Sequence, residues 1–404
     1  MPKWRGYIVS GYRAVSGYIS PVGGEVGGPV VDSPPTIYDV AARAGVSTAT
    51  VSRALNSLAS VRPSTRAKVM AAMEELEFVP NVVARGLSSG KHWILGLVFT
   101  RAVVEGNPLA HDSDTLVVEE ASLLYTDIVI RGAEMRAAEL GYSLLLSSAD
   151  ENHPSGMTSM LSLTGTVDGL ILLDRVLREE DVAYLARRIP VVLLAGQGDS
   201  PSAVTVRVDN QHAMRSLAEH LVRVHGVTRA GFVTGSNESP DSVARGDAFR
   251  SAIEEFGGTI ADVDFLEADW TSAGGEAVMA ARMQRSDPLP EAFACANDQT
   301  AVGVIYALNA GGLKVPEDLV VTGFDDISLT RYFNPPLTTI RQSGSILGQV
   351  AVDALVAMLD DAEDVKRTIV LPTELVVRGS CGCVEDIEPR PAMAEVIILK
   401  SEVG

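Results

Sequence analysis

The sequence predicts an N-terminal all-α helix-turn-helix headpiece and an α/β core of two lobes, each a parallel sheet flanked by helices. Two observations predict this fold class. Residues 36–80 carry short helical patterns separated by a glycine turn. From residue 93 onward, short apolar runs alternate with helical segments in two series that meet near Asp209. A chain of 404 residues has room for roughly two to four domains.

The helices of the headpiece have recognisable starts and stops. Thr36 opens a capping-box signature for a first helix, which Gly45 ends. Ser47 is a natural N-cap for a second helix that runs to Asn56, and Ser64 could cap a third. Three short helices with a glycine turn between the first two are typical of a helix-turn-helix bundle.

The second helix has an unusually plain polar face. Val51 and Leu55 lie four residues apart, so they share the face that packs inward. The other face carries small side chains, hydroxyl groups and one guanidinium, that of Arg53. Such a face can approach a partner closely and bind polar edges.

The charge of the chain is unevenly distributed. The whole chain has a formal net charge of −19, which is unfavourable for contact with nucleic acid. Residues 36–91, however, carry seven basic and four acidic side chains, a net charge of +3, so the remainder carries −22. This asymmetry favours a module that faces nucleic acid, attached to an acidic body.

The segments that flank the headpiece have weaker patterns. Residues 1–35 are rich in glycine without a core pattern, and we expect a disordered extension. Residues 81–91 follow Pro80 and include Gly86, so we expect a hinge helix or linker that is helical only when it is held.

The core pattern predicts parallel sheets covered on both faces. Strand-type runs begin at residues 93, 142, 167, 190 and 204, and then at 229, 263, 291 and 319. Helical segments span about 210–226, 243–257, 272–284 and 298–311. Ligands in such sheets bind beyond the carboxyl ends of the strands. The acidic stretch 100–124 interrupts the alternation of strands and helices. It is either a surface loop or a functional segment.

Several patterns that would indicate an enzyme or a membrane protein fail. The G-x-S-x-G match at residues 86–90 follows a helical segment instead of a strand, so we reject a nucleophile elbow. Neither a Walker A loop nor an H-E-x-x-H motif occurs, and we do not expect an enzyme. No apolar run approaches the ~18 residues of a membrane span, and the first 35 residues lack an apolar signal segment. We therefore expect a cytoplasmic protein without membrane association.

The three cysteines are Cys295, Cys381 and Cys383. They are too few for a disulfide framework, which fits a reducing compartment. Cys381 and Cys383 could bind a metal or oxidise, but no histidine lies near them in the sequence. We therefore interpret residues 381–404 as a tail and expect no metal and no cofactor.

The headpiece segments "TIYDVAARAGVSTATVSRALN" and "VRPSTRAKVMAAMEELEFVPNVVARGL" resemble the DNA-binding region of the lactose-repressor (LacI/GalR) family. The resemblance continues through "VARGDAF", "ANDQTAVGV", "VVTGFDD" and "PPLTTIRQ", and covers residues 36–380. It implies a headpiece at 36–80, a hinge at 81–91 and a core at 92–380 similar to periplasmic sugar-binding proteins. It also implies a homodimer, a palindromic double-stranded DNA operator, and a small-molecule effector such as a sugar or sugar phosphate.

The resemblance assigns DNA-binding roles to individual residues. Thr48, Ala49 and Arg53 hold positions that meet base edges, and Arg53 can pair bidentately with guanine. Leu87 aligns with a hinge leucine that wedges into the minor groove, although contact between two hinges is the alternative. Four others, Ser47, Thr50, Asn56 and Thr65, are expected to contact phosphate, and simple helix capping is their alternative role. The full set is Thr36, Ser47, Thr48, Ala49, Thr50, Ser52, Arg53, Asn56, Thr65, Asn81, Ala84 and Leu87.

The resemblance also places an effector site in the core. Its residues are Arg245, Asn297, Asp325, Gln342, Phe324 and Trp270. Guanidinium, amide and carboxylate groups suit a polyhydroxylated ligand, and the two aromatic rings could stack on a sugar. An inter-lobe salt bridge is the alternative role for Arg245 and Asp325. The stretch 100–124 departs from the family pattern and displaces residues usually found at the mouth of the cleft.

We therefore expect a sequence-specific DNA-binding transcriptional regulator. The specific expectation is a repressor of carbohydrate-utilisation genes that is controlled by a small sugar-like effector. The alternative is the sugar-binding component of a transport system, without DNA binding. Because the resemblance begins at Thr36, we also expect residues 1–30 to be absent from the native product.

Overall fold

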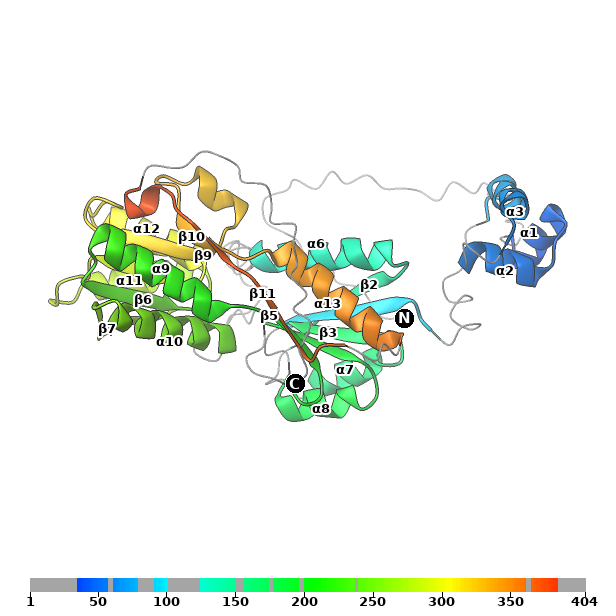
Figure 1. Cartoon of the computed structure of the whole chain (residues 1–404), viewed down its shortest axis with the longest axis horizontal. Coiled ribbons are helices and arrows are strands. Elements are labelled where there is room, and N and C mark those ends of the chain that lie inside the picture. Colours follow the sequence, from blue (N-terminus) through cyan, green and yellow to red (C-terminus); the bar gives the residue numbers. More distant parts are fainter. Residues whose placement is uncertain are drawn as a thin grey trace, which may run out of the picture. The chain divides into compact units, whose positions relative to one another are not determined.

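The computed structural model describes residues 35–56, 61–78, 91–100, 124–149, 156–173, 177–195, 200–236, 239–360 and 365–383. The chain divides into two compact units, residues 1–84 and 85–404. Helices make up the described part of the first unit, and the second contains two sheets covered by helices (Figure 1). None of the described helices is long and apolar enough to cross a membrane.

The first unit contains α1 (Ile37–Ala44), α2 (Thr48–Asn56) and α3 (Pro63–Glu75). The predicted three-helix arrangement is confirmed. The helices enclose one small core, made of Val40, Ala41, Val51, Ala54, Val69, Ala72 and Met73. Since so few side chains are buried here, the caps at the helix ends matter for the stability of this unit.

Local signals set the ends of these helices. The Asp39 carboxylate accepts hydrogen bonds of 2.7 Å from both the N–H and the hydroxyl of Thr36. The side-chain bond is the main cause of the lowered pKa of Asp39. Gly45 ends α1 with a φ of 67°, which glycine adopts without strain. The predicted cap Ser64 was wrong, because Arg62 holds the cap position and α3 begins at Pro63, a residue suited to the first helical position.

The first sheet of the second unit has the strand order β11-β5-β4-β3-β1-β2, and its paired strands run parallel. Its strands are β1 (Ile94–Thr100), β2 (Ser143–Ala149), β3 (Gly169–Leu173), β4 (Val191–Leu194), β5 (Val204–Val208) and β11 (Thr368–Leu371). Its helices are α6 (Leu124–Glu139), α7 (Gly156–Leu163), α8 (Glu179–Ala186) and α13 (Gly344–Leu359). The helices form one layer on each face of this sheet, and alternate residues of β3 pack into the two layers. Ile171 joins the core with α6 and α13, while Leu170 and Leu172 join that with α7 and α8.

The second sheet has the strand order β12-β10-β9-β8-β6-β7. Its strands are β6 (Arg229–Thr234), β7 (Thr259–Glu267), β8 (Ala292–Cys295), β9 (Val320–Asp325), β10 (Thr338–Arg341) and β12 (Glu374–Val376). Among its described strand pairs, only β10–β12 is antiparallel. One face is covered by α9 (Asn210–His225) and α10 (Pro240–Glu255), the other by α11 (Ser272–Met283) and α12 (Asp298–Ala310).

The chain passes between the two sheets after β5, after β10 and between β11 and β12. The nine strands predicted from apolar runs are confirmed. The pattern missed β10, β11 and β12, because β10 and β12 include polar residues, and β11 lies at a sheet edge with only one of its four residues buried. α13 leaves β10 and packs against α6, and Figure 1 shows these two helices side by side.

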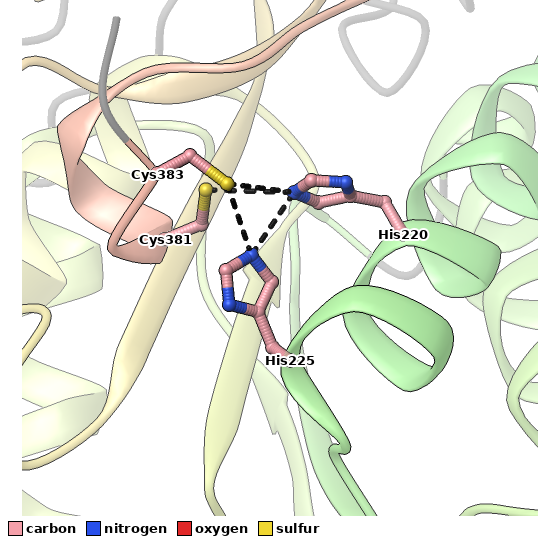
Figure 2. A group of neighbouring side chains, drawn as sticks. All are labelled: His220, His225, Cys381 and Cys383. Atoms are coloured by element: carbon pink, nitrogen blue, oxygen red, sulfur yellow. Dashed lines mark hydrogen bonds between the residues drawn. The ribbon is translucent and has the colours of Figure 1, made fainter.

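The residues around Cys381 and Cys383 correct the interpretation of a tail. Cys381 ends the 3-10 helix η2 (Gly379–Cys381), so the expected boundary after residue 380 falls inside an element. Its side chain is buried in the core. The structure also places His220 and His225 of α9 beside both cysteines (Figure 2). These histidines lie more than 150 residues away from the cysteines in the chain, so their proximity is not visible in the sequence.

Candidate DNA-binding helix and effector site

α2 presents the polar face that its sequence predicts. Ser47 caps the helix, because its Oγ accepts a 3.2 Å hydrogen bond from the N–H of Thr50. The two hydroxyls also lie 2.9 Å apart. Arg53 is exposed, and its Nε donates to the carbonyl of Ala49 at 3.2 Å. The guanidinium therefore lies along its own helix beside an exposed alanine, within reach of a partner that approaches this face.

The other predicted DNA-binding residues fall into three groups. Thr36 and Ser47 are exposed, like Ala49 and Arg53. Four are partly buried: Thr48, Thr50, Ser52 and Thr65. The remaining four lie outside the described residues in whole or in their side chains, namely Asn56 (side chain only), Asn81, Ala84 and Leu87.

The described headpiece also exposes a tyrosine that the sequence patterns did not single out. Tyr38 on α1 is 72% exposed, although an aromatic residue among helical apolar positions suggests burial. It is the second residue of α1, so a phenol lies in the first turn of the helix. Tyrosine hydroxyls and helix N-termini are both common phosphate ligands in DNA complexes.

The structure brings all six predicted effector residues to the carboxyl edge of the second sheet. Asp325 ends β9 with Phe324 before it, while Asn297, Trp270 and Gln342 follow β8, β7 and β10. Arg245 reaches this edge from α10. This is the edge at which a parallel sheet binds ligands, because the strand ends and the following loops converge there.

Arg245 is the centre of this group and is only 3% exposed. Its Nη1 donates to the carbonyl of Ala296 at 2.7 Å, and its Nε donates to Asn210 at 3.1 Å. The Asp241 carboxylate lies 3.8 Å from Nη2 of Arg245, and the Asp325 carboxylate lies 3.9 Å from Nη1. At that separation the charges attract without a short hydrogen bond, so donor capacity of the guanidinium remains for a ligand.

Two aromatic rings lie beside this guanidinium. The Arg245 Cζ atom is 3.7 Å from the ring centroid of Phe324 and 5.7 Å from that of Trp270. Asn297 fixes the backbone of Trp270, because its Nδ2 donates to the Trp270 carbonyl at 2.9 Å. The same amide caps α12 by accepting from the N–H of Thr300 at 3.0 Å. Apolar faces and hydrogen-bonding groups therefore occur together, as in small-molecule sites.

The Asp325 carboxyl has unusual electrostatics. Burial raises its pKa to about 7, against the lowering effect of Arg245 and of the hydrogen bond from Gln342. Gln342 Nε2 donates this bond at 2.5 Å. Asp325 also has a φ of 114°, a conformation that costs a non-glycine residue energy and that the surroundings must hold. Perturbed pKa and backbone strain together favour a functional role for this residue.

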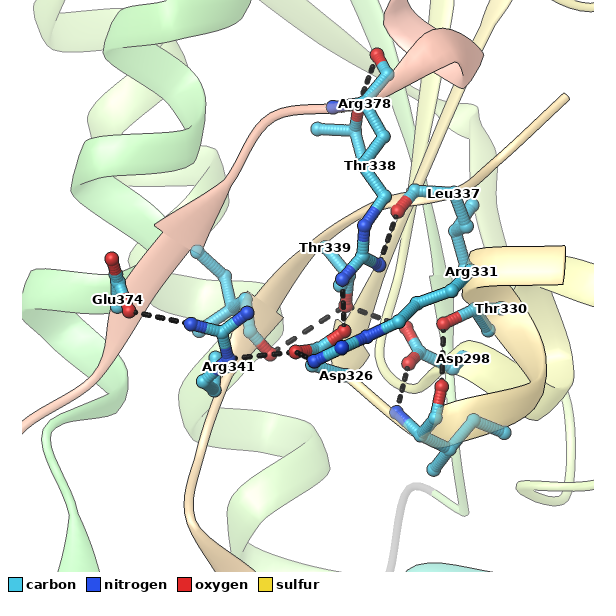
Figure 3. Close-up of polar contacts among 12 residues, drawn as sticks. Asp298, Asp326, Thr330, Arg331, Leu337, Thr338, Thr339, Arg341, Glu374 and Arg378 are labelled. Atoms are coloured by element: carbon cyan, nitrogen blue, oxygen red, sulfur yellow. Dashed lines mark hydrogen bonds and ion pairs between the residues drawn. The ribbon is translucent and has the colours of Figure 1, made fainter. Parts of the chain in front are cut away.

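Asp326 holds the strained turn after β9. Its buried carboxylate forms ion pairs with three arginines. The N···O distances are 2.5 Å to Arg378, 2.7 Å to Arg341 and 3.5 Å to Arg331. Arg341 also pairs with Glu374 of β12 at 2.8 Å. Figure 3 shows these guanidinium groups converging on one carboxylate. The network joins β9, β10 and β12, so it fixes the segment that carries Asp325.

The structure adds three residues to the predicted effector group. Asn210 starts α9 and donates to Asp241 at 2.7 Å, and both contact Arg245. The spacing of Asp241 and Arg245 on one helix was a signal, since residues four apart share a face. Tyr125, from the first turn of α6, was not visible in the sequence. Among the described residues, its buried hydroxyl has no hydrogen-bond partner, and its pKa is raised by burial and then by Asp325.

Comparisons with known proteins agree with this geometry. Residues 36–81 match the family of bacterial regulatory proteins of the lacI type, and residues 218–381 match a periplasmic binding protein-like domain. The chain is 33% identical to catabolite control protein A of Priestia megaterium, over 85% of this chain and 98% of that protein. The chain belongs to the LacI family.

Other comparisons place this LacI-family chain among solved and curated repressors. It is 32% identical to the ribose operon repressor of Escherichia coli, over 85% of this chain and 99% of the relative. The lac repressor dimer bound to operator and the anti-inducer ONPF superposes with a TM-score of 0.70 at 28% identity. A complex of the transcriptional regulator CelR with cellobiose superposes with a TM-score of 0.61 at 26% identity. Each comparison covers 86% of this chain and 99% of the solved chain.

The headpiece and the core of this LacI-family protein therefore confirm the predicted fold class. The chain is a DNA-binding transcriptional regulator, and the alternative of a transport component without DNA binding is not favoured.

Proposed function

We propose that this LacI-family regulator is a repressor of carbohydrate-utilisation genes. It acts in the cytoplasm as a homodimer on a palindromic operator, has no enzymatic activity, and responds to a small sugar-like effector. The observation that carries the proposal is the pairing of a polar exposed helix face, on α2, with a buried polar and aromatic group at the carboxyl edge of the second sheet.

The α2 face suits the major groove. Exposed Ala49 lets the helix approach base edges closely, and Arg53 supplies bidentate donors that recognise guanine. Ser47 serves first as a helix cap, and its outward position suits phosphate as well. The proposed roles of Asn81, Ala84 and Leu87 in the hinge rest on the family resemblance alone.

The Arg245 group suits a polyhydroxylated ligand. Arg245, Asp325 and the Tyr125 hydroxyl offer donors and acceptors, and the partly buried Trp270 offers an apolar face, whereas Phe324 is fully buried under the Arg245 guanidinium. Two relatives support a sugar as the ligand class: one is named for the ribose operon, and one solved neighbour holds cellobiose.

Tyr125 also connects the site to the first sheet. It belongs to α6, which packs against α13, and the N–H of Leu124 donates to Gln299 of α12 at 3.0 Å. A ligand that bonds both Tyr125 and Arg245 would stabilise one arrangement of the two lobes. Such a preference of about 3 kcal/mol is enough to change operator affinity roughly a hundredfold.

The proposal is tested by selecting genomic DNA fragments with the purified protein and sequencing them. We expect one short palindrome near genes for carbohydrate use. Anisotropy titrations of that operator, with a panel of aldoses, disaccharides and sugar phosphates, then identify the effector. Equal enrichment of unrelated fragments would contradict operator recognition. A response only to compounds outside the sugars would leave DNA binding intact and overturn the carbohydrate assignment.

A further inference from the structure

Four side chains that no step of DNA or effector binding uses meet at one end of the second sheet. His220 and His225 come from the last turns of α9, and Cys381 and Cys383 come from η2 and the residues that follow it. The two imidazole Nε2 atoms and the two sulfur atoms all lie within 4.8 Å of one another. Figure 2 shows both rings and both thiols directed toward the space between them.

Four of the six separations are close to the edges of a tetrahedral ligand set. Zn²⁺ binds sulfur at about 2.3 Å and imidazole nitrogen at about 2.0–2.1 Å. A tetrahedron with these bonds has N···S edges of about 3.5 Å and an N···N edge of about 3.3 Å. The observed Nε2···Sγ distances are 3.5 Å for His220–Cys381, 3.4 Å for His225–Cys383 and 3.8 Å for His220–Cys383. The two Nε2 atoms are 3.1 Å apart.

Hydrogen bonds among the four groups do not account for this arrangement. His220 Nε2 lies near three partners, namely His225 and the two cysteines. A neutral imidazole nitrogen offers either one proton or one lone pair, and a thiol is a weak donor. One nitrogen therefore cannot satisfy three such neighbours, whereas a cation between them would accept one lone pair from each ligand.

The protonation states are compatible with metal binding. Burial, and then the neighbouring His225, lower the pKa of His220, and burial lowers that of His225, which favours the neutral form that carries a lone pair. Burial raises the pKa of Cys383 to about 11 when no cation is present. A bound divalent cation reverses this preference, and the two thiols lose their protons to solvent as the cation binds.

We propose that His220, His225, Cys381 and Cys383 form a structural Zn²⁺ site. Two imidazoles and two thiolates favour zinc among the common divalent cations, and the two thiolate charges balance that of the ion. Four protein ligands fill a tetrahedral shell, so no position is open for catalysis.

The site joins two parts of the chain that are far apart in the sequence. The chain crosses from the first sheet to the second twice, and each part follows a different crossing. α9 follows the first passage from β5, whereas β12 and η2 follow the last passage from β11. α9 also packs beside β12. Zinc would therefore fasten the last described segment to the second sheet, and it would stabilise the folded state because the unfolded chain does not hold the four ligands together.

The test uses the untagged full-length protein, reduced and stripped with a chelator, and then titrated with Co²⁺ and Zn²⁺. We expect about one ion per chain, thiolate-to-Co²⁺ charge-transfer absorption, and the intense visible bands of tetrahedral cobalt. Zinc should also raise the melting temperature. Cys383→Ser, at a partly exposed position, should keep the fold but bind Co²⁺ more weakly, with about half of the charge-transfer absorption.

Two matched controls use the same residue types. His212→Gln changes an exposed histidine of α9, and Cys295→Ala changes a buried cysteine of β8; both should bind Co²⁺ like the wild type. A wild-type protein without the tetrahedral cobalt spectrum would overturn the proposal. The same holds for an unchanged spectrum in Cys383→Ser, or for a Cys381–Cys383 disulfide in protein isolated without oxygen.

Discussion

Gln342 donates a 2.5 Å hydrogen bond to Asp325, and this bond links the end of β9 to the passage that leads from β10 into α13. α13 packs against α6, which supplies Tyr125 to the same site. The proposed effector residue Asp325 is thus attached to the segment that connects the two sheets. If a ligand changed the hydrogen bonding of Asp325, Gln342 in the connection between β10 and α13 would lose or change its partner.

The raised pKa of Asp325 predicts a particular dependence of stability on pH. Its folded value is about 7 and its ordinary value is 3.8, so between these values the folded chain keeps a proton that the unfolded chain has lost. This residue's contribution to stability therefore falls as the pH rises through that range. Asp325→Asn does not titrate, so its melting temperature should decline less between pH 5 and pH 8. Calorimetry at several pH values measures both curves.

Asp262→Asn is the matched control for the pH experiment. Its side chain is 98% exposed and has a single ion pair, with Arg250. Its melting temperature should follow the wild-type curve. If Asp325→Asn also follows that curve, the unusual titration of Asp325 is wrong.

Asp325→Asn should also uncouple the effector from the operator. Loss of one charge-assisted hydrogen bond weakens ligand binding by about 1.5–3 kcal/mol, or roughly 10- to 150-fold. Operator affinity without ligand should stay close to that of the wild type. Fluorescence anisotropy with and without the identified effector measures both quantities. A wild-type ligand response in this variant would remove Asp325 from the effector site.

Arg53→Ala should reduce discrimination between operator and random DNA. A bidentate arginine–guanine pair contributes about 1–3 kcal/mol of discrimination, so operator affinity should fall roughly 10- to 100-fold while random DNA is bound nearly as before. Lys68→Ala removes the same charge from an exposed position of α3 and should weaken both affinities alike. Equal losses for both DNAs in Arg53→Ala would contradict a base-reading role.

Asp326→Asn should destabilise the core. Three guanidinium groups surround this buried carboxylate, and removing its charge leaves them without compensation. Breaking a buried ion pair costs about 3–5 kcal/mol. Urea denaturation should therefore show a loss of that order in the free energy of unfolding, against a small change for Asp262→Asn. A loss as small as that of the exposed control would show that the network has little effect on stability.

The sequence by itself determined the elements whose signals are local. Thr36, Gly45 and Ser47 set the ends of α1 and α2 because caps act within one helical turn. Nine strands were visible as apolar runs, and most of them, such as β3, β8 and β9, are buried on both faces. The family resemblance also selected effector residues that the fold brings to one edge.

Only the tertiary structure decided which distant residues meet. His220 and Cys381 are 161 positions apart, yet the passages of the chain between the sheets bring their side chains to 3.5 Å. Tyr125 reaches Asp325 and Arg245 for the same reason, and the three arginines around Asp326 come from separate segments. Local propensities act over a few residues, whereas these contacts depend on how two sheets are connected. No pattern along the chain records that connection.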